Sequence, residues 1–171
     1  MRNWIAFFAT TALPASASAQ AVGLDPAAAA DIAGAVSDCW KAVGVRDVNR
    51  SSLAAAGWKT ATATDPKGGS VTSPPGLYGQ ARRNAVIMVP AQASQPMCSV
   101  IARVPSQNDL GPAVATIQKA LVELNPKVET ARDGNSIYFL ALPKLAMVDP
   151  TGSKDRPGMR IVVGYQNSEK K

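Results

Sequence analysis

Two cysteines, Cys39 and Cys98, constrain the fold of this chain more than any other feature of its sequence. Cys39 lies in a stretch with helical periodicity, and Cys98 lies in 97–104, the second of two adjacent stretches that each predict a β-strand. A disulfide between them would join a helix to the sheet that the helix covers. The alternative is two separate buried thiols.

The N-terminal residues predict export from the cell. Arg2 gives a short basic start, 4–13 is apolar, and Ala17-Ser18-Ala19 is a small-x-small cleavage site, so residues 1–19 have the pattern of a signal peptide. The apolar run of roughly 10 residues is about half of the ~20 that span a bilayer, so we expect no stable membrane span. We therefore expect a periplasmic or secreted protein of a bacterial host, and an oxidising compartment that favours the disulfide.

The composition predicts one folded domain at 20–166 and a frayed, charged tail at 167–171. The hydrophobic fraction of 46% and the charged fraction of 18% are typical of globular chains. The formal charge of +6 becomes +5 when Arg2 is removed with the signal peptide. Because the basic residues are scattered and not arranged in a stripe, we expect no nucleic acid partner and favour a protein or an anionic envelope polymer.

Periodicity predicts two main helices. The first begins at Asp25-Pro26, with aspartate as N-cap and proline at the first helical position, and runs to Val43 with Ile32, Val36 and Cys39 on one face. The second follows 106–109 and ends at Asn125, because the residue before proline disfavours helix.

Apolar runs predict the strands, which lie at 58–64, 85–89, 97–104, 127–132, 137–148 and 159–165. The predicted fold class is α+β, with an antiparallel sheet of about five to six strands and two main helices packed on one face. The order, a helix and three strands given twice, suggests a worn αβββ duplication.

Two turn-rich stretches, 65–83 and 149–158, predict long basic loops. Long loops in compact domains are often functional, so we expect their side chains to contact a partner, although the first loop has the alternative of a mobile insertion. The candidate partner-binding residues are Lys67, Leu77, Tyr78, Arg82, Arg83, Lys154 and Arg156.

The sequence contains no histidine, which excludes Ser-His-Asp and Cys-His catalytic systems and the commonest ligand of catalytic metals. Motifs for dinucleotides, phosphate loops and calcium are also absent, so we predict no catalytic residue, no metal and no cofactor. Among the acidic residues, Asp38 is the one without an evident structural role.

We therefore expect a small, exported, non-enzymatic binding or accessory module of the cell envelope that uses loops 65–83 and 149–158. One alternative is an inhibitor or chaperone-like partner of an envelope enzyme. The other is a carboxylate-dependent hydrolase, since glycosidases need only two carboxylates. The sequence does not predict an oligomeric state.

Overall fold

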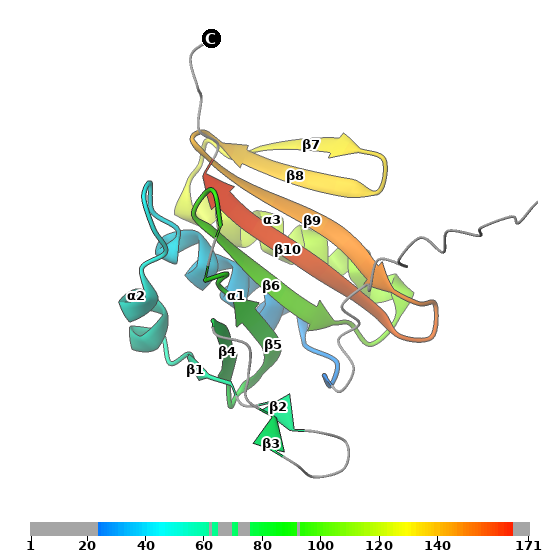
Figure 1. The fold of residues 1–171 in the computed structure, drawn as a ribbon. Helices are drawn as coiled ribbons and strands as arrows, with labels where there is room; N and C mark the ends of the chain where they lie inside the picture. The colour runs from blue at the N-terminus through cyan, green and yellow to red at the C-terminus, as the bar shows by residue number, and fades with distance from the viewer. Residues whose placement is uncertain (1–23, 62, 65–69, 72–75, 92, 166–171) are drawn as a thin grey trace, which may run out of the picture.

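The computed structural model describes residues 24–61, 63–64, 70–71, 76–91 and 93–165. An antiparallel sheet of eight strands forms one layer, and helices α1 (Ala29–Ala42) and α3 (Leu110–Leu124) lie together against one face of it (Figure 1). The short helix α2 (Arg50–Ala55) follows α1, and a 3-10 turn, η1 (Gln107–Asp109), precedes α3. The predicted α+β class is confirmed. The predicted signal peptide and tail lie outside the described residues.

The spatial order of the strands in the sheet is β1 (Lys59–Thr60), β4 (Leu77–Gln80), β5 (Arg83–Met88), β6 (Met97–Arg103), β10 (Pro157–Tyr165), β9 (Lys144–Gly152), β8 (Ser136–Ala141) and β7 (Glu129–Asp133). Strands β2 (Ala63–Thr64) and β3 (Ser70–Val71) pair with each other outside this sheet. The predicted count of five to six strands is therefore too low.

The two halves of the chain have the same topology. Strands β1, β4, β5 and β6 follow α1, and strands β7 to β10 follow α3. The last strands of the halves, β6 and β10, pair antiparallel at the centre of the sheet. This order fits the predicted duplication, which stays a prediction.

The first predicted loop, 65–83, is wrong where it covers β4 and the start of β5. Leu77 of β4 pairs with Met88 of β5, and the Val89 N–H donates to the Gly76 carbonyl over 2.7 Å. Gly76 has φ +96°, and a Cβ there would meet the Val89 carbonyl. Gly76 therefore adjoins β4 and Gly79 lies within it, because pairing with β5 outweighs their turn preference.

The second predicted loop, 149–158, is also mostly strand. Strand β9 continues to Gly152 and β10 begins at Pro157, so residues 153–156 alone form the turn. Pro150 is tolerated because β9 extends past Ser136, the first residue of β8, and is there the outer strand of the sheet. The predicted strand 137–148 is in fact two strands, since the chain reverses at Leu142–Pro143.

Helix α1 begins later than predicted. Ala28 is its N-cap, and Asp25 precedes the helix without capping it. The Ala27 N–H donates to the Arg103 carbonyl over 2.9 Å, so this segment pairs with the end of β6 before the helix starts. A backbone bond to the sheet thus outweighs the local capping preference of Asp25-Pro26.

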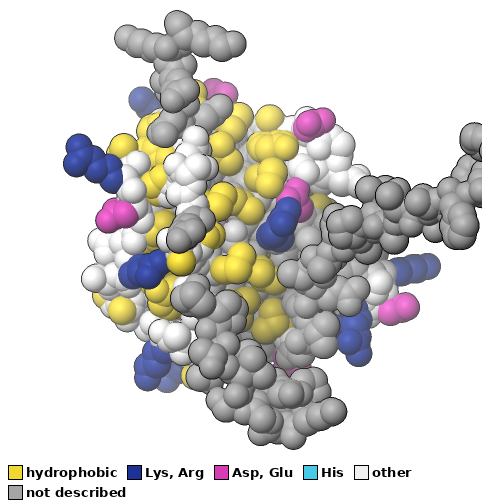
Figure 2. Space-filling model, in the orientation of Figure 1, with side chains coloured by type: hydrophobic (Ala, Val, Ile, Leu, Met, Phe, Trp, Pro, Cys, Tyr) yellow, Lys and Arg dark blue, Asp and Glu magenta, His cyan; other side chains and the backbone are white. Residues whose placement is uncertain are grey.

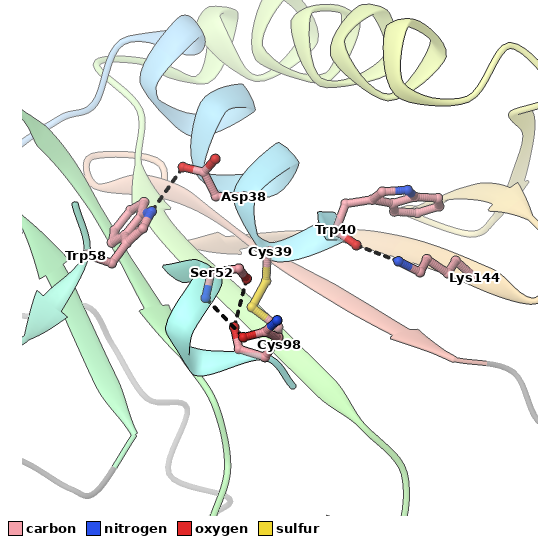
Figure 3. The surroundings of a disulfide bond; sticks show 8 residues. Asp38, Cys39, Trp40, Ser52, Trp58, Cys98 and Lys144 are labelled. Atoms are coloured by element: carbon pink, nitrogen blue, oxygen red, sulfur yellow. Dashed lines mark hydrogen bonds between the residues drawn. A yellow bond between two sulfur atoms is a disulfide. The ribbon is translucent and has the colours of Figure 1, made fainter. Parts of the chain in front are cut away.

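Cys39 of α1 and Cys98 of β6 form the predicted disulfide (Figure 3). Their Cα atoms are 5.8 Å apart, and both residues are completely buried between the helix and the sheet. Around them the core contains apolar side chains of both helices and of the central strands, among them Ile32, Val36, Ile117, Val100 and Ile161. The cross-link therefore joins the two layers inside the core.

Candidate functional site

The predicted partner-binding residues of the first stretch do not form one surface. Lys67 lies outside the described residues. Leu77 and Tyr78 are neighbours on β4 and therefore point to opposite faces of the sheet; Tyr78 packs against the core on the helix side. Arg82 is exposed in the turn between β4 and β5.

Arg83 has a structural role. Its guanidinium lies 2.9 Å from the Asp38 carboxylate and 5.8 Å from the centre of the Trp58 ring. The Trp58 indole N–H donates to the same carboxylate oxygen over 3.0 Å (Figure 3). Asp38, whose role the sequence does not reveal, thus connects α1 to β5 and to the residue before β1. Because this cluster is internally paired, we do not assign it to partner binding.

Lys154 and Arg156 lie exposed in the turn between β9 and β10, with Asp155 between them. Ala85 of β5 and Met159 of β10 both pair with Ala102 of β6, so β5 and β10 begin at the same end of the sheet. The turn before β10 and the turn before β5, which holds Arg82, therefore lie at that end. The structure therefore brings three of the predicted basic residues to one end of the fold.

Among the described residues, Lys144 has a pKa that is shifted from the ordinary value of its side chain. Its Nζ donates to the Trp40 carbonyl over 2.8 Å (Figure 3). The same atom lies 5.9 Å from the centre of the Trp40 ring and 5.6 Å from the centre of the Tyr165 ring. Burial lowers the pKa of Lys144 below its ordinary value of 10.5. The Trp40 carbonyl lies in the last turn of α1, where carbonyls lack helical partners, so Lys144 caps the helix C-terminus.

A surface groove of about 600 Å³ lies between the α1–α2 connection and the β5–β6 connection. Arg46 and Arg50 line one side with Asp47 between them, and Pro90 and Pro96 line the other. The Asn49 side chain, also in the wall, accepts the N–H of Ser52 over 3.0 Å and caps α2. Asn49 is thus engaged in local structure.

The largest unassigned feature is the sheet face that points away from α1 and α3, which we call the open face. Side chains alternate along a strand, so the residues between the buried positions of each strand lie on this face. One row of paired residues crosses seven strands from β4 to β7. It consists of Leu77, Met88, Ser99, Val162, Met147, Tyr138 and Ala131.

Two neighbouring rows extend this apolar surface. Val86 and Ile101 continue it on one side, and Met97, Leu145 and Leu140 continue it on the other. Ser99 is buried and Ala131 is exposed, while the large apolar residues of the three rows are half-buried. A soluble fold usually covers a sheet face as apolar as this one.

Charge in the middle of the open face is confined to a paired group, whereas Glu129 and Asp133 share this face with Ala131 on the outer strand β7, and Arg103 shares it with Ile101 at the end of β6. Arg160 and Asp149 are neighbours across β10 and β9, and their side chains lie 3.1 Å apart. The Ser136 hydroxyl donates to the second oxygen of Asp149 over 2.6 Å. In the view of Figure 1 the sheet lies in front of the helices, so Figure 2 shows this face. Apolar side chains gather across its middle, and most of the visible charged side chains lie towards its outline (Figure 2).

The sequence contained a signal for this face. The run 85–89 is apolar without alternation, which indicates a strand whose two faces are both covered or a strand with one apolar face left exposed. The same holds for 137–142 and for the shorter run 161–163. Only the structure shows that the helices cover one side, which leaves the other apolar side without a covering layer of described elements.

Within the described residues, no group of three or more acidic or cysteine side chains could hold a metal ion. The helices in this part of the chain are too short or too polar to cross a bilayer. Comparisons with protein-family models, with curated proteins and with solved structures found no match to this chain.

Proposed function

We propose that this chain is a small, exported, non-enzymatic binding module of the cell envelope that takes a protein partner on its open face. The observation that carries the proposal is the largely apolar surface that crosses the sheet from β4 to β8. Monomeric soluble proteins rarely expose a contiguous apolar surface of this kind unless it is an interaction site. The disulfide supports export, because such bonds persist in oxidising compartments.

The composition of the face favours a protein over an anionic polymer. Met88, Met97 and Met147 all lie on it, and methionine is enriched in protein interfaces because its flexible thioether adapts to a partner surface. Arg160 is paired with Asp149, and Glu129 and Asp133 of β7 outweigh Arg103 on the same face, so the face has no net positive charge to attract a polyanion.

The exposed residues Arg82, Lys154 and Arg156 lie at one end of this surface and form a basic rim. Charged rims surround the apolar centre of many interfaces and act mainly on the association rate. In this proposal the basic residues predicted from the sequence contribute to recognition, but the apolar face supplies most of the binding energy.

Site-specific photo-crosslinking in cells that export the protein tests the proposal. A photoreactive residue at Met147 should form protein adducts, and a matched residue at exposed Lys119 of α3 should form none. Equal labelling at both positions, or no adduct at Met147, would refute the assignment of the open face.

A further inference from the structure

We infer that the partner on the open face is a second copy of this chain, an inference that rests on the proposed function. The two copies would pack face to face through their sheets. The assembly would then have four layers, with the helices outside and the two sheets in the middle. Facing sheets pack about 10 Å apart at an angle of about −30°, and the twist of each sheet produces that angle.

The charge distribution is compatible with two identical faces. Although the whole chain has a formal charge of +6, Arg160 and Asp149 in the middle of the open face neutralise each other. The other charged side chains on this face lie at its margins, where Glu129 and Asp133 are on the outer strand β7 and Arg103 is at the end of β6. A two-fold axis that lies between the two sheets, perpendicular to the strands, reverses the strand direction of the second copy. The basic rims of the two copies then lie at opposite ends of the dimer. The positive charge of the chain therefore does not prevent association through this face.

The size of the face also meets the requirement of a stable dimer. Seven strands that each occupy about 4.8 Å have a width of about 34 Å, and three rows of side chains that each occupy about 6.8 Å take up roughly 20 Å along the strands. The plan area is thus roughly 700 Å², which is near the ~800 Å² per partner of a standard interface.

The shape of the face suits sheet packing as well. Its central residue, Val162, has the short side chain of Ser99 on one side and the long, flexible side chain of Met147 on the other. Such height differences allow two copies to interdigitate, and the three methionines can adjust to the side chains opposite them. A second copy supplies an apolar surface of the same shape, which can cover this face.

Sedimentation velocity of the purified exported chain tests the inference. Wild type should sediment with twice the monomer mass, with a dimer fraction that rises with concentration. Val162→Glu should raise the dimer dissociation constant at least about tenfold, because it places a charge in the centre of the interface. Lys119→Glu, on the exposed side of α3, is the matched control and should leave the dimer unchanged.

A second variant guards against loss of folding. Tyr138→Ser lies on β8, two strands from β10, and should weaken the dimer while circular dichroism shows an intact fold. A wild type that stays monomeric at every concentration overturns the inference, and so does a dimer that neither variant weakens. A monomeric wild type that still crosslinks to a different protein at the Met147 position overturns the proposed dimer and leaves the proposed function intact. A monomer without such adducts overturns the proposed function too.

Discussion

Removal of the Cys39–Cys98 disulfide should cost this fold about 4 kcal/mol of unfolding free energy. The two cysteines are separated by 59 residues in sequence, and closing a loop of that length removes chain entropy from the unfolded state worth about 4 kcal/mol at 25 °C. For a chain of this size, each kcal/mol lowers the melting temperature by about 2–4 °C. The variant Cys39→Ala/Cys98→Ala should therefore melt about 8–16 °C below wild type.

The matched control is Val36→Ala/Val100→Ala. Val36 lies on α1 and Val100 on β6, as the cysteines do, and both are 1% exposed or less. This pair creates space in the same core layer without removing a cross-link, so its cost comes from lost packing. Both double variants thus remove buried atoms, but only the cysteine variant also removes the cross-link.

Urea unfolding separates the two effects. Without the tether the unfolded chain expands and exposes more surface, so the slope of unfolding free energy against urea should increase for the cysteine variant and stay constant for the valine variant. A cysteine variant with an unchanged slope and a melting temperature within a few degrees of wild type would show that the disulfide does not stabilise the fold in this way.

Three further predictions concern the described contacts. In a double-mutant cycle, Asp38→Ala and Arg83→Ala should show a coupling of about 1 kcal/mol in unfolding free energy, since the pair is only partly exposed; complete additivity would contradict its role as a connector. Gly152→Ala should lower the unfolding free energy by more than about 1 kcal/mol, because φ is +82° and the new Cβ would meet the Arg156 carbonyl. Gly134→Ala should lower it less, because Gly134 has φ +57° and open space around it. Chemical denaturation that ranks the two variants in the opposite order would contradict this reasoning. Burial lowers the pKa of Lys144 in the folded state below 10.5, so the unfolded state binds more protons at pH values between that lowered pKa and 10.5. In this window the unfolding free energy of wild type, measured relative to Lys144→Gln, should rise with pH. A fall there would contradict the direction of the shift.

The helices and the disulfide were predictable from sequence because they depend on short-range or compositional signals. Apolar spacing places Ile32, Val36 and Cys39 on one face of α1 as predicted, and all three are buried. The end of α3 at Asn125 also agrees, because a proline follows it. The chain has two cysteines, and in a chain predicted to be exported such a pair favours a disulfide.

Errors in the prediction arose where long-range pairing overrides local preference. Strand β4 lies among glycines that individually favour turns, yet it pairs with β5 over the length of the strand. The start of α1 is displaced because Ala27 bonds to Arg103, a residue far along the chain. Neither pairing leaves a mark in the local sequence, since backbone groups of any residue type can form it.

The sequence by itself determined the α+β class and the helix faces, because periodicity acts locally, and it favoured a disulfide between Cys39 and Cys98 and two helices on one face of the sheet. Only the tertiary structure decided which side chains of each strand α1 and α3 cover. A strand that is apolar on both sides does not specify which side a helix will cover. That choice leaves Val162, Met147 and their neighbours on the open face, where the proposed partner binds.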